Sequence, residues 1–140
     1  MKKLFVCFLI LLLALSLAAC GKAGNAKGID LKADELNEAN PGDTLRIVVK
    51  ENHTTQYRWY FDVSGDDILE VASDDWSLDS NLFDRGGSGG TRTITFLAIA
   101  SGETAVRMAL LPEMPERSEP FDFDEDVGRE QTAIYSITVK

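Results

Sequence analysis

Residues 57–63 read Tyr-Arg-Trp-Tyr-Phe-Asp-Val, a run in which a large apolar or aromatic residue occupies every odd-numbered position. Successive side chains of a β-strand point to opposite faces, so this alternation predicts a strand with one face in a core and the other toward water. Trp59 lies at the centre of the apolar face and is expected to be buried, with Tyr57 beside it on the same face.

Five more stretches show the same two-residue period, and turn signals separate them. The predicted strands lie within residues 44–50, 69–71, 93–98, 104–110 and 132–139, and the turns within 40–43, 64–67, 86–90 and 101–102. Residues 29–39 could form either a short helix or an edge strand. Six short strands with no clear helix predict an all-β fold, specifically an immunoglobulin-like antiparallel β-sandwich, in which a core tryptophan on the third strand is usual.

The order of these strands places three connections at one end of the sandwich, provided that successive strands run antiparallel. These connections are residues 51–55, 75–90 and 112–130, and they are also the chemically unusual stretches of the chain. Loops presented together by a rigid scaffold are a common arrangement for binding.

The first twenty residues predict export and a lipid anchor. Lys2 and Lys3 precede an apolar run that is shorter than the roughly 20 residues of a membrane-spanning helix. The run ends in Leu-Ala-Ala-Cys at 17–20, which resembles the bacterial lipobox, although ordinary signal cleavage beside an incidental cysteine is an alternative. We expect a signal peptide at 1–19, a lipidated Cys20 with a tether at 20–28, and one domain at 29–140, exported and lipid-anchored at the bacterial cell envelope.

Charge and residue usage argue against several function classes. The formal net charge is −9, and the sequence shows no basic stripe, so we expect no nucleic-acid partner. Cleavage would remove Cys7 and lipid would modify Cys20, leaving no thiol for catalysis, a disulfide or zinc. His53 is the sole histidine and no nucleophile motif accompanies it, so we expect no enzyme activity and no cofactor. The acidic stretch 122–126 could bind calcium, but it lacks the EF-hand spacing, and we interpret it as a solvated loop without metal.

Two of the three connections carry recognisable motifs. Residues 52–59 read Asn-His-Thr-Thr-Gln-Tyr-Arg-Trp, and residues 87–90 read Gly-Ser-Gly-Gly just before a predicted strand. These resemble the Asn-Pro-Thr-Thr-Gly-Tyr/Phe-x-Trp and Gly-x-Gly-Gly motifs of the chagasin family of cysteine peptidase inhibitors. His53 and Gln56 stand where proline and glycine are usual. The third family element, an Arg-Pro-Trp-like loop, is reduced here to a proline within Leu-Pro-Glu-Met at 111–114.

The resemblance implies a monomeric, reversible inhibitor of papain-like cysteine peptidases. In this family three loops form a wedge in the active-site cleft, with the Thr-Thr loop over the catalytic cysteine and histidine, and no bond to the enzyme is made. The residues expected to bind the peptidase are Asn52, His53, Thr54, Thr55, Gln56, Tyr57, Gly87, Ser88, Gly89, Gly90, Pro112, Glu113 and Met114. The glycines are expected to let the partner chain approach closely.

Two questions stay open at this point. The altered third loop leaves the alternative of a lipid-anchored immunoglobulin-like binding or adhesion module with no peptidase target. His53, lacking the restraint of a proline ring, predicts a first loop that is freer before binding, unless the side chain makes a contact that proline cannot make.

Overall fold

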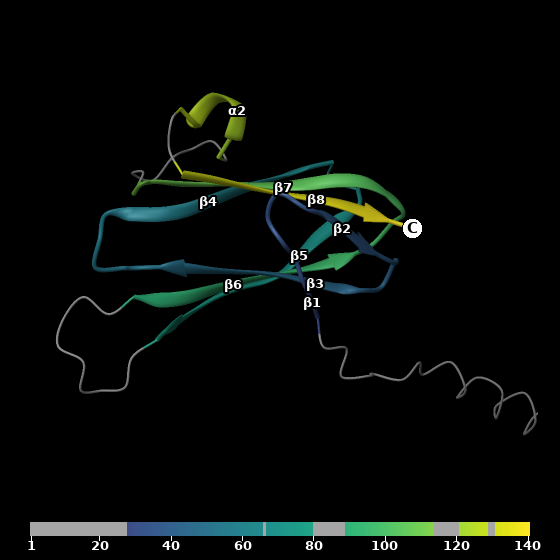
Figure 1. Cartoon of the computed structure of the whole chain (residues 1–140), viewed down its shortest axis with the longest axis horizontal. Helices are drawn as coiled ribbons and strands as arrows, with labels where there is room; N and C mark the ends of the chain where they lie inside the picture. Colours follow the sequence, from purple (N-terminus) through teal and green to yellow (C-terminus); the bar gives the residue numbers. More distant parts are fainter. Residues whose placement is uncertain (1–27, 66, 80–88, 114–120, 129–130) are drawn as a thin grey trace, which may run out of the picture.

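The computed structural model describes residues 28–65, 67–79, 89–113, 121–128 and 131–140, which form two sheets packed face to face (Figure 1). The predicted signal peptide, Cys20 and nearly all of the predicted tether lie outside these residues, as do Gly87, Ser88 and Met114. Among the residues that are described, no helix is long and apolar enough to cross a membrane.

Each sheet contains four strands, and the fold is the predicted immunoglobulin-like sandwich. One sheet has the order β1 (Ile29–Asp30), β3 (Thr44–Glu51), β6 (Gly90–Ala98), β5 (Leu69–Leu78). The other has the order β2 (Leu36–Ala39), β8 (Gln131–Val139), β7 (Gly102–Pro112), β4 (Tyr57–Ser64). Neighbours are antiparallel except for β1 with β3 and β2 with β8, which are parallel.

The ambiguous stretch at the start of the domain is a pair of short edge strands rather than a helix. The chain leaves one sheet after β1 and joins the other at β2, with Asp34 in the left-handed region at φ 59° between them. Asn37 holds this crossover: its side chain accepts from the Lys32 amide at 2.9 Å and donates to the Lys32 and Glu35 carbonyls. The crossover also brings Leu31 into the core.

The core consists of the inward residues of the alternating strands, as the period-two pattern predicts. Its largest fully buried side chains are Leu45, Ile47, Ile94, Phe96, Val106, Met108 and Ile137. Trp59 is 6% exposed, which confirms its predicted burial. The expectation for Tyr57 is wrong, because this residue is 50% exposed. It is the first residue of β4 and pairs with Pro112, the last of β7, so it lies at the rim of the sandwich.

Strand β5 is longer than the sequence predicts. The pattern places residues 75–78 in a loop, whereas the strand continues to Leu78 and pairs with Gly90 at its end. A register shift between Val71 and Ser73 interrupts the alternation, and Val71 is 46% exposed on this edge strand. The strand therefore lacks the regular apolar pattern by which such elements are recognised in a sequence.

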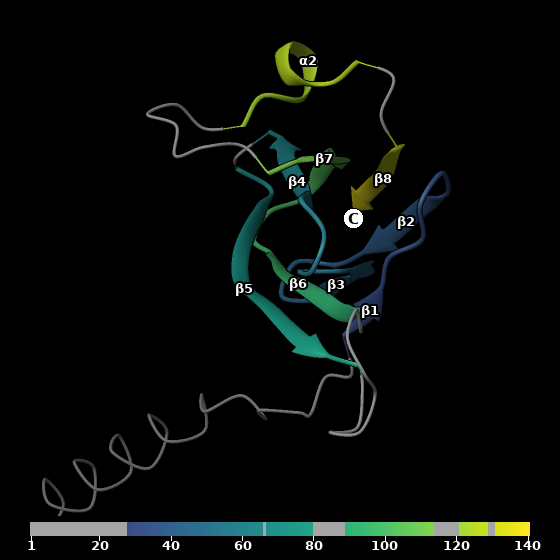
Figure 2. The ribbon, with the colours of Figure 1, turned by 90° about the vertical axis from the view of Figure 1, so that its left-hand side faces the viewer.

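A short helix, α2 (Phe123–Asp126), lies on the outer side of the β2-β8-β7-β4 sheet (Figures 1 and 2). Arg107 of β7 attaches it: the guanidinium binds the Asp124 carboxylate at 2.9 Å, binds Asp62 of β4 at 2.6 and 2.9 Å, and lies 5.0 Å from the centre of the Phe123 ring. Among the described residues, no group of three acidic, histidine or cysteine side chains is arranged to hold a metal ion.

The predicted clustering of loops at one end is confirmed for their described parts. Glu51 pairs with Gly90 and Gly90 pairs with Leu78, so the β3–β4 connection and the stem of the β5–β6 connection lie together. Tyr57 pairs with Pro112, which adds the start of the third connection (left side of Figure 1).

Candidate functional site at the loop end

The first loop, residues 52–56, is ordered by its own side chains. Asn52 Oδ1 accepts hydrogen bonds from the Thr54 amide at 2.9 Å and from the Thr54 hydroxyl at 2.8 Å. The Asn52 carbonyl accepts from the Thr55 amide at 3.1 Å and from the Thr55 hydroxyl at 2.8 Å. Asparagine favours such local turns because its short side chain can bond to the backbone two residues further on. Thr54 and Thr55 remain exposed at the tip.

Arg58 supports the loop from β4. Its Nη1 donates at 2.8 Å to both the Thr55 and Tyr57 carbonyls, and its Nη2 lies 3.4 Å from the His53 carbonyl. One planar guanidinium thus holds three backbone oxygens, an arrangement that the rigid fork of arginine permits.

The stem of the second loop lies beside the first. The Asp79 amide donates to the Gly89 carbonyl at 3.1 Å. Lys50 Nζ contacts the Asp79 carboxylate at 2.6 Å and the Thr91 hydroxyl at 2.9 Å. The hydrogen bonds that Lys50 and Thr91 donate lower the pKa of Asp79, so this carboxylate stays ionised in mildly acidic solution.

Gly90 has a packing role inside the domain that the motif does not reveal. A Cβ atom on this residue would come within 2.3 Å of the Trp76 indole, so only glycine fits beneath that ring. Gly90 is itself buried and pairs with Glu51 and Leu78. Its lack of a side chain serves packing inside the domain, and its contact with a partner chain stays a prediction. Gly89 has more open surroundings, because a Cβ atom on that residue would meet Asn52 Cβ as its nearest neighbour, at 3.9 Å.

The start of the third loop is hydrogen-bonded to the first loop. The Glu113 amide donates to the Gln56 carbonyl, and the Glu113 carboxylate lies 3.4 Å from Arg58 Nη2. Pro112 is exposed at the end of β7. The described parts of the three loops therefore form one connected surface.

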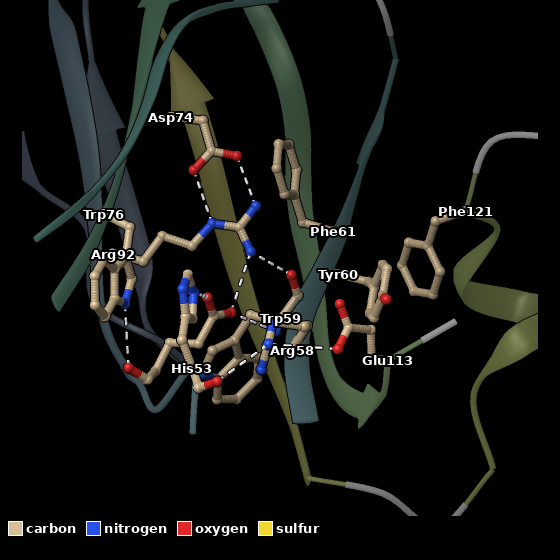
Figure 3. Close-up of a pocket in the computed structure, with 11 residues that line it drawn as sticks. His53, Arg58, Trp59, Tyr60, Phe61, Asp74, Trp76, Arg92, Glu113 and Phe121 are labelled. Atoms are coloured by element: carbon tan, nitrogen blue, oxygen red, sulfur yellow. Dashed lines mark hydrogen bonds and ion pairs between the residues drawn. The ribbon is translucent and has the colours of Figure 1, made fainter. Parts of the chain in front are cut away.

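Two hollows mark this surface. The smaller, of about 230 Å³, brings together five of the predicted binding residues, namely Asn52, Thr55, Tyr57, Gly89 and Gly90. The larger, of about 510 Å³, is a groove between the edge strands β4 and β5, and Figure 3 shows its aromatic and charged lining. His53 and Glu113 line the groove from the first and third loops.

Comparison with known proteins agrees with this geometry. The model of the family described as chagasin family peptidase inhibitor I42 matches residues 38–123, more than half of the chain. The chain belongs to the chagasin family. No match was found among curated protein sequences.

Solved structures of similar fold include a protein described as a cysteine protease inhibitor. The cysteine protease inhibitor EhICP2 from Entamoeba histolytica superposes with a TM-score of 0.58 at 16% identity, covering 75% of this chain and 86% of that protein. Amebosin superposes with a TM-score of 0.56 at 19% identity, covering 81% of this chain and 98% of that protein. PbICP-C, solved in complex with falcipain-2, superposes with a TM-score of 0.51 at 12% identity, covering 83% of this chain and 93% of that protein. At these identities the likeness is one of fold.

This chagasin-family member also has supporting residues that the motifs do not reveal. Arg92 of β6 donates to both oxygens of Asp74 at 2.6 and 2.7 Å, to the Trp59 carbonyl, and at 3.4 Å to Glu51. The hydrogen bonds that Arg92 donates to Asp74 raise the pKa of Arg92, which keeps the guanidinium charged. Glu51 and Arg92 together bind the backbone amide and carbonyl of Trp59 on the free edge of β4.

His53 does not point outward from the loop tip. Its ring stacks on Trp76, and its Nε2 atom lies 2.6 Å from Glu51 Oε1. The structure therefore favours the alternative in which His53 makes a contact that proline cannot make. Trp76 and Glu51 carry no motif signal, since one lies in a stretch predicted as loop and the other ends a strand.

Proposed function

We propose that this chagasin-family protein is a reversible inhibitor of papain-like cysteine peptidases that blocks the active-site cleft with its loop end. The observation that carries the proposal is the exposed loop 52–56, which is hydrogen-bonded within itself and lies beside Gly89 and the end of β7 at one end of the domain. The complex of PbICP-C with falcipain-2 and the cysteine protease inhibitor EhICP2 support it, since both share this fold.

The chemistry of the loop tip suits a cysteine–histidine centre. Both threonine hydroxyls donate their hydrogens within the loop, to Asn52 Oδ1 and to the Asn52 carbonyl. Each hydroxyl oxygen therefore offers only acceptor lone pairs to a partner. A catalytic imidazole presents N–H donors, which such oxygens can accept. Threonine is also stiff about χ1, so ordering these side chains on docking costs little conformational entropy.

The third loop contributes by charge rather than by an aromatic anchor. Residues 111–114, Leu-Pro-Glu-Met, stand where the family has an Arg-Pro-Trp-like loop, so Glu113 brings the opposite charge, and the whole chain carries a net charge of −9. Such charge accelerates association with a basic partner and makes it sensitive to salt, with a smaller effect on final affinity. We include Met114 in the contact because its flexible side chain adapts to irregular apolar surfaces.

The proposed place of action is the outside of a bacterial membrane, with a lipid on Cys20 holding a monomeric domain on its tether. An acidic body is repelled by an anionic membrane surface, so the lipid would supply the attachment.

Titration of papain with the purified protein, read by cleavage of a fluorogenic peptide, tests the proposal. We expect complete inhibition at one inhibitor per enzyme, full recovery of activity on dilution, and an intact inhibitor chain by mass spectrometry. A folded protein that leaves papain and several related peptidases fully active would favour the adhesion-module alternative.

A further inference from the structure

The His53 ring contacts Trp76 with its face and Glu51 with its edge. Its ring and the Trp76 indole are stacked, with centroids 4.1 Å apart and planes at 10° (Figure 3). Its Nε2 contacts Glu51, whose side chain is only 2% exposed and whose other oxygen accepts the Trp59 amide at 2.7 Å. A carboxylate oxygen accepts a hydrogen bond from the imidazole tautomer that carries its hydrogen on Nε2.

Trp76 is fixed in turn by the strand beneath it. Its Nε1 donates to the Glu51 carbonyl at 3.2 Å, and the absence of a side chain on Gly90 lets the indole lie directly on β6. Gly90, Trp76 and His53 thus form three layers, contributed by β6, β5 and the first loop.

We propose that this stack acts as a clamp that sets the conformation of the first loop before it meets a peptidase, with Trp76 and Glu51 as positioning residues. The inference rests on the proposed function. His53 follows Asn52, the residue whose oxygens order Thr54 and Thr55, so fixing the imidazole fixes the backbone on which both threonines depend. Where family members have proline, ring stacking replaces the covalent restraint. A loop ordered in advance loses less entropy on binding.

The decisive variants are Trp76→Leu, which removes the stacking surface, and Gly90→Ala, which displaces the indole. Each should raise the inhibition constant against papain about tenfold and speed amide hydrogen exchange of Thr54 and Thr55, the amides bonded to Asn52. Trp76→Phe retains a flat ring and should restore most of the inhibition. The control is Val71→Ala, an exposed residue of the same strand, which should change neither quantity.

A double-mutant cycle separates a clamp from general destabilisation. His53→Ala combined with Trp76→Leu should be no worse for inhibition than either change alone, because both break one contact. Unchanged inhibition and exchange in a folded Trp76→Leu protein would overturn the proposal, as would a lower melting temperature with unchanged inhibition. If the wild-type protein fails to inhibit, the proposed function is wrong, and exchange at Thr54 and Thr55 still decides whether the clamp orders the loop.

Discussion

At the scale of single residues, Thr54 and Thr55 should dominate inhibition. They are the exposed tip of an ordered loop, whereas Glu113 is already engaged with Arg58 and the backbone of Gln56. Thr54→Ala with Thr55→Ala should weaken binding to papain more than tenfold, or about 1.4 kcal/mol. Glu113→Ala with Met114→Ala should weaken it less.

Changing both threonines to serine provides the control, because serine keeps the hydroxyls that bond within the loop and should retain most of the affinity. Greater damage from the Glu113 and Met114 pair would mean that the third loop dominates binding despite its altered sequence.

Trp59 and Tyr57 provide a second test at this scale, since they differ in burial on one strand. Trp59 is in the core, and its Nε1 donates to the Lys50 carbonyl at 3.0 Å. Trp59→Ala should lower the free energy of unfolding by about 3–5 kcal/mol. Tyr57→Ala, at the exposed rim, should change it by about 0.5 kcal/mol. Urea unfolding curves of both variants measure the difference, and equal losses would contradict this placement of the two rings.

At the scale of elements, the attachment of α2 depends on Arg107. This guanidinium donates hydrogen bonds to Asp62 and Asp124, and these bonds raise the pKa of Arg107, so the guanidinium stays charged. Arg107→Met should speed amide exchange of Phe123, whose amide bonds to Asp62 at 3.2 Å, about tenfold or more with little change in melting temperature.

The matched control for that experiment is Arg46→Met, which removes a comparable arginine–aspartate pair with Asp30 on the other sheet. It should leave the exchange of Phe123 unchanged. Slow exchange of Phe123 in the Arg107 variant would show that aromatic packing alone holds the helix.

Elements with a regular apolar period could be predicted from the sequence, and those that depend on distant partners could not. The core residues of β3 and β6 alternate without interruption, so the prediction of these two strands and of their inward faces is confirmed. Strand β5 was predicted too short because its bulge breaks the period and its edge position leaves Val71 exposed. Ala109 and Leu111 are buried on the outer face of β7, which no alternation predicts.

The candidate site also has a part that could be predicted from the sequence and a part that could not. The residues of its tip are consecutive in the sequence, so Asn52, Thr54 and Thr55 could be predicted from their resemblance to the family motif. Its support comes from side chains that are far apart in the chain, such as Trp76 against His53 and Arg92 against Glu51. Their pairing depends on the register of three strands, which a single sequence does not specify.

At the scale of the whole molecule, the proposed attachment to the cell surface depends on Cys20. The apolar run before Cys20 is too short to span a bilayer, and the excess of 23 acidic over 14 basic residues disfavours attachment by charge. Lipid on Cys20 should therefore be the sole anchor. Cys20→Ser should move the protein from the membrane pellet to the soluble fraction of fractionated cells. Cys7→Ser, a matched change inside the apolar run, should leave it in the pellet, because that residue would be removed with the signal. A Cys20→Ser protein that still sediments with membranes would assign the attachment to the signal segment or to a partner.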